Sequence, residues 1–465
     1  MPNTLDQVLT VAQMQAAEQA LIDAGSSVEE LMQLAGEGAA QWVWRIAAKR
    51  SVTVLCGPSN NGGDGYVIAE SLRGRGLAVQ VVAPIGPKTE AAKAARRSFK
   101  GETLTSGKQA KGQVLVDCLF GSGLSRALDA EHALILRDLV NRAHYRIAVD
   151  LPSGVESDSG ALLNDGLPEY DCTLALGAWK FAHWRLPARS KMGSLKLVPI
   201  GVGAVQGAAR VIGKPAFRAP SVDSHKYRRG LCAVVAGAMP GAALLACQAA
   251  QHAGAGYVKL LADGSGPPAP ASLVVESAPL DEALSDQRIN AVLVGPGLGR
   301  DKAASEQFRA VLKTGKPAVL DADALMQLKP EMLHEGMPIL ATPHDGELDQ
   351  LCRAFGVIGE GRQARALSLS KVSGMVICAK GPDTLVATPD GRLALAQPAS
   401  SWLSTAGTGD VLAGIAVSRM ATGSDPFTAA CEAVWLHSEA ARRAGPAFSA
   451  DQLAQHVQGA YAAAL

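Results

Sequence analysis

The chain has 465 residues, more than one hydrophobic core usually supports, so its length predicts about two or three domains. Its 44 basic residues nearly balance its 43 acidic ones, and aromatic residues make up only 4% of it. This excludes a strongly basic surface or base-stacking platform for nucleic acid. The cysteines form no CxxC pair, which disfavours a zinc site and favours a reduced, cytoplasmic compartment.

The N-terminal half alternates between helical and strand-like patterns. Apolar residues recur at helical spacing over 5–23 and 27–48. The strand-like segments that follow, with helical patterns between them, are 52–56, 78–83, 113–118, 145–150, 172–176 and 195–200. This alternation predicts a parallel, doubly wound sheet, whose ligands bind at the carboxyl ends of the strands.

Three motifs of this half follow predicted strands. Residues 57–65 read GPSNNGGDG, which predicts a glycine-rich loop before a helix that starts at Tyr66. Such a strand–loop–helix unit binds phosphate, although the motif matches neither GxGxxG nor a P-loop and could be an ordinary tight turn. DCLFGSGL (117–124) and DLPSG (150–154) stand at two further strand ends. We therefore expect the three motifs to meet in one pocket.

A Gly- and Pro-containing stretch, 206–221, predicts a linker between a domain at 1–205 and another at 222–465. The second domain repeats the alternation, with strand-like segments at 232–236, 256–261, 291–294, 317–320, 338–341 and 375–378. Residues 231–250 carry no charge, which a membrane helix would also show. Pro240 with its flanking glycines favours a buried strand, a turn and a core helix instead, and no signal peptide is visible.

The most informative motif is STAGTGDVLAG at 404–414. Gly407 and Gly409 let backbone N–H groups approach an anion, and the helix predicted to begin near Asp410 points its positive end at the same place. A carboxylate beside an anion suits a group that takes the proton of a hydroxyl attacking a phosphoryl group. The alternative is that Asp410 only caps the helix.

GPGLG (295–299), TPHDGE (342–347) and AKGPDT (379–384) precede this motif. In this order the four motifs resemble the ribokinase-like ADP- or ATP-dependent NAD(P)H-hydrate dehydratases over about 222–465. NNGGDG with DCLFGSGL and DLPSG resembles the NAD(P)H-hydrate epimerase domain over about 1–205, so the chain as a whole resembles the bifunctional NAD(P)H-hydrate repair enzymes. The resemblance implies two three-layer α/β/α domains, Rossmann-like and then ribokinase-like. Ser59 and Tyr227-Arg228 depart from the family pattern at the rims of the pockets.

For the second domain the resemblance implies Asp410 as the catalytic residue and ADP with Mg²⁺ as the phosphoryl donor. The implied nucleotide-binding residues are Lys380, Gly381, Pro382, Asp383, Thr384 and Gly409. The implied hydrate-binding residues are Ala242, Gly297, Gly299, His344 and Asp410. For His344 the alternative is a polar turn residue.

For the first domain the resemblance implies Asp150 as the catalytic acid or base and a potassium ion held by Asn61, Asp117 and Ser153. The implied hydrate-binding residues are Asn60, Asn61, Gly62, Gly63, Asp64, Gly121, Ser122, Gly123, Leu124, Ser125, Arg126, Ala127 and Asp150. Amide, carboxylate and hydroxyl oxygens are ligands that a hard cation takes. For Asp117 and Asp150 the alternative is the capping of a strand end.

The expected function is repair of hydrated NADH and NADPH (NADHX and NADPHX). The first domain would interconvert the R and S epimers, and the second would dehydrate the S epimer with ADP, giving AMP and phosphate. The alternative is a vitamin or sugar kinase fused to a non-catalytic binding module. We expect a cytoplasmic homo-oligomer with no nucleic-acid or membrane partner. The residues alone do not decide between ADP and ATP, between the two hydrates, or which bond opens during epimerisation.

Overall fold

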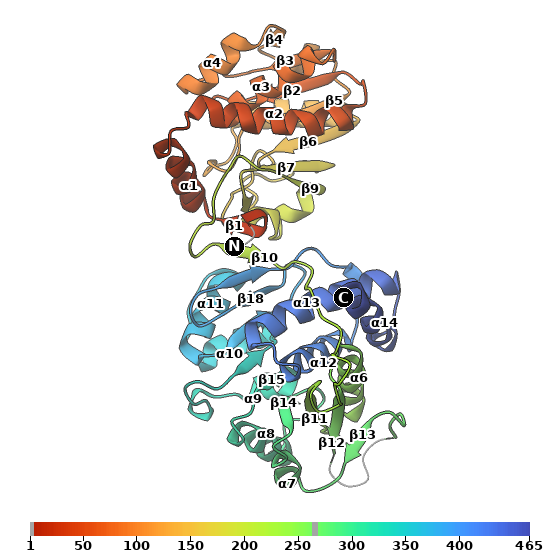
Figure 1. Cartoon of the computed structure of the whole chain (residues 1–465). Coiled ribbons are helices and arrows are strands. Elements are labelled where there is room, and N and C mark those ends of the chain that lie inside the picture. Colours follow the sequence, from red (N-terminus) through yellow and green to blue (C-terminus); the bar gives the residue numbers. More distant parts are fainter. Residues whose placement is uncertain (1–3, 263–267) are drawn as a thin grey trace. The chain divides into compact units, whose positions relative to one another are not determined.

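A computed structural model describes residues 4–262 and 268–465. The chain divides into two compact units, Met1–Ala209 and Arg210–Leu465. Helices and strands alternate along each unit (Figure 1), as the periodicity predicts.

The first unit is built on a seven-stranded sheet in which all neighbouring strands are parallel. In spatial order its strands are β4 (Glu102–Leu104), β3 (Val79–Val82), β2 (Val52–Cys56), β5 (Val114–Cys118), β6 (Tyr145–Val149), β7 (Cys172–Leu176) and β9 (Ser194–Val198). The order reverses direction between β2 and β5, which is where ligands of doubly wound sheets bind.

Helices cover both faces of this sheet. They are α1 (Val11–Asp23), α2 (Val28–Ala47), α3 (Asn60–Gly74), α4 (Glu90–Ser98) and α5 (Ala130–Arg142). Alternate residues of a strand face opposite ways, so Val54 belongs to the apolar cluster shared with α2 and α3, and Leu55 to the cluster shared with α5. The unit is therefore a three-layer α/β/α sandwich.

The structure corrects the predicted start of the first helix. The residues before it form a 3-10 turn and a short strand, β1 (Gln7–Leu9), which pairs in parallel with β8 (Trp179–Lys180). Helix α1 begins at Val11 because Thr10 and Gln13 form a reciprocal capping box. A helical pattern alone does not distinguish this strand from the helix that follows.

The predicted glycine-rich loop at 57–65 was also wrong in part, because α3 already begins at Asn60. A Cβ on Gly62 would lie 1.9 Å from the carbonyl oxygen of Gly57, and one on Gly63 would lie 2.5 Å from the Met32 side chain. These glycines therefore let the first turns of α3 pack closely against the sheet and α2. Only the first N–H groups of the helix remain for an anion.

The second unit has a larger sheet, parallel from β13 to β17 and antiparallel through β18 and β19. In spatial order its strands are β13 (Val274–Glu276), β12 (Tyr257–Leu261), β11 (Leu231–Val235), β14 (Ile289–Val294), β15 (Ala318–Leu320), β16 (Ile339–Ala341), β17 (Val376–Ala379), β18 (Leu385–Ala387), β19 (Leu393–Leu395) and β10 (Ala209–Val211). Strand β10 comes from the predicted linker and pairs with β19. That part of the linker is therefore sheet.

The helices of the second unit form two layers. One layer is α6 (Pro240–His252), α12 (Thr408–Ala421), α13 (Pro426–Ala444) and α14 (Ala450–Ala463), which share one apolar core with β11. The helices α7 (Leu280–Leu284), α8 (Lys302–Lys313), α9 (Ala322–Gln327), α10 (Asp345–Ala354) and α11 (Gly361–Ser373) complete the unit, and Figure 1 shows α8 to α11 across the sheet from α6 and α12.

The uncharged stretch 231–250 forms β11 and most of α6, as predicted. Helix α6 is short and lies in the core of the unit, so its apolar composition reflects packing. Across the part of the chain that the structure describes, no helix combines the length and the hydropathy needed to cross a membrane.

Candidate active sites

The second unit presents an anion-binding helix terminus at α12. Gly407 precedes the helix with a φ of +88°, and Gly409 and Asp410 lie in its first turn. A Cβ on Gly409 would lie 3.5 Å from Nζ of Lys380, so the lysine of the 379–384 motif reaches the same terminus. Free N–H groups and a lysine ammonium together suit a phosphate group.

The carboxyl group of Asp410 lies at this terminus and has a raised pKa. Its side chain is partly buried, and it accepts no hydrogen bond from the described residues. Burial and the neighbouring carboxylate of Asp321 raise the pKa of Asp410 to about 6, against an opposing effect of Lys380. A carboxyl group with that pKa can exchange a proton near neutral pH, as a general base must.

Two acidic residues outside the predicted set complete this site. Oδ1 of Asp321 lies 2.6 Å from Nζ of Lys380 and accepts a hydrogen bond of 2.8 Å from Thr342 Oγ1. Glu347 is buried, with Oε2 3.9 Å from the same Nζ. Burial alone would lower the pKa of Lys380, but these two carboxylates raise it. The sequence feature that could have indicated Asp321 is its position directly after the predicted strand 317–320. For Glu347 it is the position at the end of the TPHDGE motif.

His344 has a structural role at the start of α10. It caps α10, with Nδ1 accepting hydrogen bonds from the N–H groups of Gly346 and Glu347 at 3.0 and 3.3 Å. Its backbone N–H in turn donates to Oε2 of Glu347 at 2.8 Å. The imidazole is 61% exposed, and its Nε2 lies 3.4 Å from Oε1 of the buried Glu347.

Gly297, Gly299 and Ala242 lie around the start of α6. Gly297 has a φ of +61°, and its carbonyl accepts a hydrogen bond of 2.8 Å from the N–H of Met239. A Cβ there would lie 2.2 Å from the carbonyl oxygen of Met239, so the loop can approach α6 only with glycine. The N–H of Gly299 donates to Asp323 Oδ2 at 3.0 Å.

The 380–384 loop is held in shape by its own polar contacts. Thr384 Oγ1 donates to the carbonyl of Gly381 at 2.7 Å, and Arg362 makes ion pairs with Asp345 and Asp383. Gly381 and Pro382 are exposed. The loop is therefore preformed and open to a ligand.

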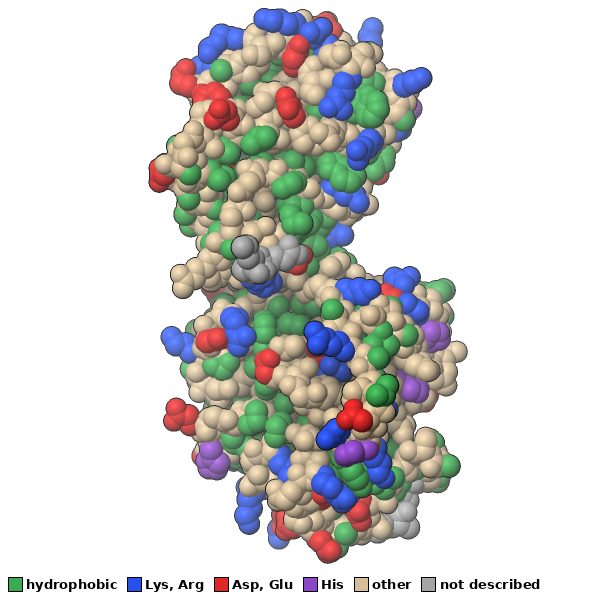
Figure 2. Space-filling view, in the orientation of Figure 1, with side chains coloured by type: hydrophobic (Ala, Val, Ile, Leu, Met, Phe, Trp, Pro, Cys, Tyr) green, Lys and Arg blue, Asp and Glu red, His purple; other side chains and the backbone are tan. Residues whose placement is uncertain are grey.

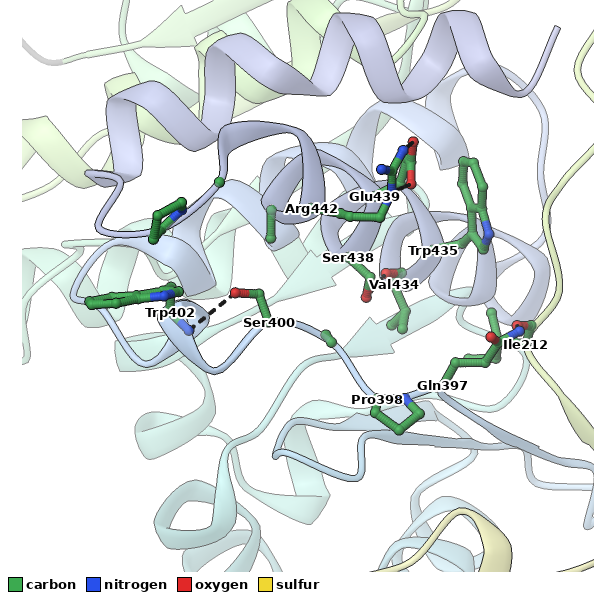
Figure 3. Close-up of a pocket in the computed structure, with 14 residues that line it drawn as sticks. Ile212, Gln397, Pro398, Ser400, Trp402, Val434, Trp435, Ser438, Glu439 and Arg442 are labelled. Carbon is green, nitrogen blue, oxygen red and sulfur yellow. Dashed lines mark hydrogen bonds and ion pairs between the residues drawn. The ribbon is translucent and has the colours of Figure 1, made fainter. Parts of the chain in front are cut away.

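A groove with a volume of about 490 Å³ lies between α13 and the segment 397–402. Figure 3 shows Val434 and Ser438 pointing from α13 toward that segment, with Trp402 and Trp435 bordering the groove. One residue before Ser438, His437 donates from Nε2 to the carbonyl of Thr408, 2.9 Å away, and burial lowers its pKa to about 4. The groove and His437 thus share helix α13, and sequence patterns did not indicate the groove.

The first unit contains a cavity of similar volume, about 490 Å³, where its three motifs meet. Its lining includes Asn60, Asn61, Asp64, Gly121, Ser122, Gly123 and Asp150 of the predicted set. Gly62 and Gly63 are buried in α3, and Leu124, Ser125, Arg126 and Ala127 do not line the cavity. Helix α1 contributes Gln15, Glu18 and Gln19, which no motif indicated.

Asp150 follows β6 and has a φ of +67°, a backbone conformation that non-glycine residues adopt rarely. Its Oδ2 accepts a hydrogen bond of 2.8 Å from the N–H of Ser122, and its Oδ1 lies 2.6 Å from Nζ of Lys180. Burial alone would raise the pKa of Asp150, but Lys180 and Ser122 lower it to about 2. The residue is therefore an ionised carboxylate in the cavity wall.

The three predicted potassium ligands differ in how much of their bonding capacity is free. Asn61 is buried, and neither its Oδ1 nor its Nδ2 has a hydrogen-bond partner. Asp117 accepts hydrogen bonds from Ser153 Oγ and N, the N–H of Leu119 and the hydroxyl of Tyr170, which together use most of its acceptor capacity. Asn61 thus offers the unengaged oxygen that a hard cation would fit.

These features define a two-unit α/β protein with a ribokinase-like phosphate terminus in one unit and an acidic Rossmann-type cavity in the other. Residues 232–461 match the family model described as NAD(P)H-hydrate dehydratase, and residues 28–182 match that described as YjeF-related protein N-terminus. The chain belongs to the bifunctional NAD(P)H-hydrate repair enzyme family, and it combines an epimerase unit with a dehydratase unit.

Two curated relatives carry this assignment. The bifunctional NAD(P)H-hydrate repair enzyme of Salinibacter ruber is 31% identical, over 94% of this chain and 92% of the relative. That of Gloeobacter violaceus is 32% identical, over 92% of each chain. A ribokinase-like superfamily protein from Enterococcus faecalis V583 shares the fold of the second unit, with 21% identity and a TM-score of 0.50 over 56% of this chain and 98% of that one.

Proposed function

We propose that the second unit dehydrates the S epimer of NAD(P)H hydrate by transferring a phosphoryl group from ADP to the hydrate's hydroxyl. Hydroxide is a poor leaving group, whereas phosphate is a good one. Once the hydroxyl is phosphorylated, the lone pair of the ring nitrogen expels phosphate, and loss of a proton from the adjacent carbon restores the dihydropyridine. The convergence of Asp410, Lys380 and the α12 terminus is the observation that carries this proposal.

Asp410 is the residue we assign to the hydroxyl proton. It stands in the first turn of α12 beside the phosphate position, and its carboxylate is not engaged by other described residues. Lys380 and the N–H groups of α12 would stabilise the charge on the transferred group. Their positions are already fixed, because Asp321 and Glu347 hold the lysine ammonium.

The groove beside α13 is the position we propose for the adenosine part of the nucleotide. It is lined mainly by apolar and aromatic side chains with a few polar groups, as base-binding pockets are. The 380–384 loop, whose Lys380 reaches the α12 terminus, would contact the phosphates. Trp402→Ala should weaken ADP binding about 10-fold or more, the loss of roughly one base–aromatic stacking contact, and titration calorimetry would measure it.

Mg²⁺ would enter this site with the nucleotide. Within residues 4–262 and 268–465, no group of three or more His, Cys, Asp or Glu side chains is placed to hold a metal ion. Mg²⁺ commonly takes one or two carboxylates together with phosphate and water oxygens, and Asp321 and Glu347 are the carboxylates nearest to Lys380. The ion would neutralise phosphate charge.

We propose that the cavity of the first unit interconverts the epimers, with Asp150 beside the hydrated ring. The carboxylate is ionised and backed by Lys180, so it can accept the hydroxyl proton and return it. The substrate's diphosphate would lie toward the first turn of α3 and the Gly121–Gly123 segment, in which the N–H of Ser122 already donates to Asp150. Potassium would be held by Asn61, Asp117 and Ser153, where it would offset phosphate charge.

The deciding experiment supplies purified R and S hydrates separately. The full chain should restore nicotinamide absorbance from the S epimer with ADP, and from the R epimer only through epimerisation. A stable phosphorylated product with no restored absorbance would instead indicate an ordinary kinase.

A cytoplasmic location and a homo-oligomeric state are further parts of this proposal. All eight cysteines are free thiols and seven are buried, which suits a reducing compartment. Helix α2 exposes Leu34 and Trp44, at 54% and 46%, which suits contact with a second copy. Light scattering of the purified chain would test the oligomeric state, and a monomer would refute it.

A further inference from the structure

Lys180 is a buried cation that no motif indicated. It ends the short strand β8, and its side chain is 1% exposed. Lysine side chains usually reach solvent, and a fully buried one requires a partner for its charge. Here Nζ donates hydrogen bonds of 2.6 Å to Asp150 Oδ1 and of 2.6 Å to the carbonyl of Leu176.

His183 fixes the relative positions of the two charged residues. Its Nδ1 accepts a hydrogen bond of 2.9 Å from the N–H of Lys180, so Nε2 carries the proton and donates to the carbonyl of Asp150, 2.8 Å away. Burial lowers the pKa of His183 to about 4, which keeps this ring neutral. The imidazole therefore connects the backbones of Asp150 and Lys180 without adding charge.

Lys180 also stands out among the residues that line the cavity. Of the described residues that line it, three carry carboxyl groups, namely Glu18 from α1, Asp64 from α3 and Asp150, whereas Lys180 is the only lysine or arginine among them. Within the described part of the chain, the one ion pair of this lysine is with Asp150. Burial raises the pKa values of Asp64 and Glu18, whereas contact with Lys180 lowers the pKa of Asp150.

We propose that Lys180 is a positioning residue for epimerisation: its ammonium holds the Asp150 carboxylate ionised and aimed into the cavity, and His183 holds the pair in register. The inference rests on the proposed epimerase role of Asp150. It assigns the reactive carboxylate to Asp150 rather than to Asp64 or Glu18 by geometry, because only Asp150 has the cation in contact.

The test compares Lys180→Met with Lys180→Arg in the full chain. Lys180→Met should lower the kcat for epimerisation about 100-fold at neutral pH, the usual range for a lost acid–base group, with little change in KM. It should also move the acidic limb of the kcat profile up by more than one pH unit. Lys180→Arg, which keeps the charge, should keep the limb near its original pH. The dehydratase rate of each preparation provides the control for folding and concentration.

Stability measurements provide a second readout in case Lys180→Met folds poorly. Asp150→Asn combined with Lys180→Met removes both charges, so the double variant should melt at a higher temperature than Lys180→Met alone. An unshifted acidic limb in Lys180→Met, or a double variant no more stable than that single one, would overturn the proposal. Absence of epimerase activity in the unaltered chain would instead overturn the epimerase role itself, and the melting comparison would still report on the pair.

Discussion

Each unit places an aspartate and a lysine at the same edge of a parallel sheet, yet the two aspartates have opposite proton affinities. In the first unit Lys180 contacts Asp150 directly, and the pKa of Asp150 falls to about 2. In the second, Lys380 contacts Asp321 instead, and the pKa of Asp410 rises to about 6. The effect of a lysine on the pKa of an aspartate in such a site therefore depends on which carboxylate its ammonium contacts.

The difference matches what each proposed reaction needs. Epimerisation needs a carboxylate that is ionised when the substrate binds, and Asp150 meets this condition at every pH above about 2. A phosphoryl-transfer base must take a proton from a hydroxyl once and release it later, which a pKa near neutrality favours. Similar folds thus carry differently tuned carboxylates.

The largest expected effect is on dehydration. Asp410→Asn keeps the size of the side chain but removes its basicity, so dehydration should slow by at least about 100-fold. ADP affinity should persist, because Lys380 and the 380–384 loop are unchanged, and epimer exchange should be untouched. Hydrate turnover, nucleotide affinity and epimer exchange measured on one preparation would check this. Near-normal turnover would exclude Asp410 from catalysis, and lost ADP binding would indicate that it maintains the anion site instead.

The corresponding substitution in the first unit is Asp150→Asn. Epimer exchange should fall by about 100-fold as well, while the S epimer supplied directly should be dehydrated at the normal rate. Chromatographic separation of the epimers over time would measure the first quantity and absorbance the second. A simultaneous loss of both activities would indicate that the substitution disturbs the fold.

The pH dependence of the two activities should differ. Asp410 must be ionised to act as a base, so dehydration should fall as pH drops through about 6. Asp150 stays ionised down to about 2, so its titration should leave epimerisation unaffected over the same interval. The raised pKa of Asp410 also means that the folded state binds its proton more tightly than the unfolded state. Its contribution to stability therefore declines as pH rises from the usual carboxyl range through 6. Separate pH–rate profiles would check the contrast, and coincident acidic limbs would contradict it.

Separating the units tests whether each site is self-sufficient. Each site is built from residues of one compact unit. We expect fragments 1–209 and 210–465 each to fold and keep one activity, within a few-fold of the full chain. Cutting instead at residue 221 would remove β10 from the second fragment and should lower its melting temperature. Circular dichroism and the two assays would show whether a folded fragment has lost its activity.

The smallest expected effect concerns potassium. If Asn61 and Asp117 hold the ion, potassium should raise the melting temperature of the first unit modestly, and Asp117→Ala should abolish that shift without affecting dehydration. Tyr170→Phe frees one acceptor position on Asp117 and should increase the shift. Sodium at equal ionic strength is the control. An equal shift with both ions would exclude a selective site.

The sequence by itself determined the alternation of strands and helices and the placement of Asp150 and Asp410 at the ends of these elements. Apolar runs that end in turn residues locate the strand ends, and parallel sheets bring those ends to one edge. This is why Asp150, the first residue of DLPSG, lies at the end of a strand and lines the cavity, as the motif predicted. Asp321 also follows a predicted strand. A single acidic residue at a strand end can equally be a structural cap, so no local pattern marked Asp321 as part of the site.

Only the tertiary structure decided which groups meet and in which state of charge. Lys180 occurs in an apolar, aromatic segment whose local pattern gives no hint of Asp150, 30 residues earlier. The glycines of NNGGDG suggested a loop, but close contacts with Gly57 and Met32 place them inside a helix. Burial and the contacts between side chains distant in sequence set the pKa values, and these depend on packing that no local pattern records.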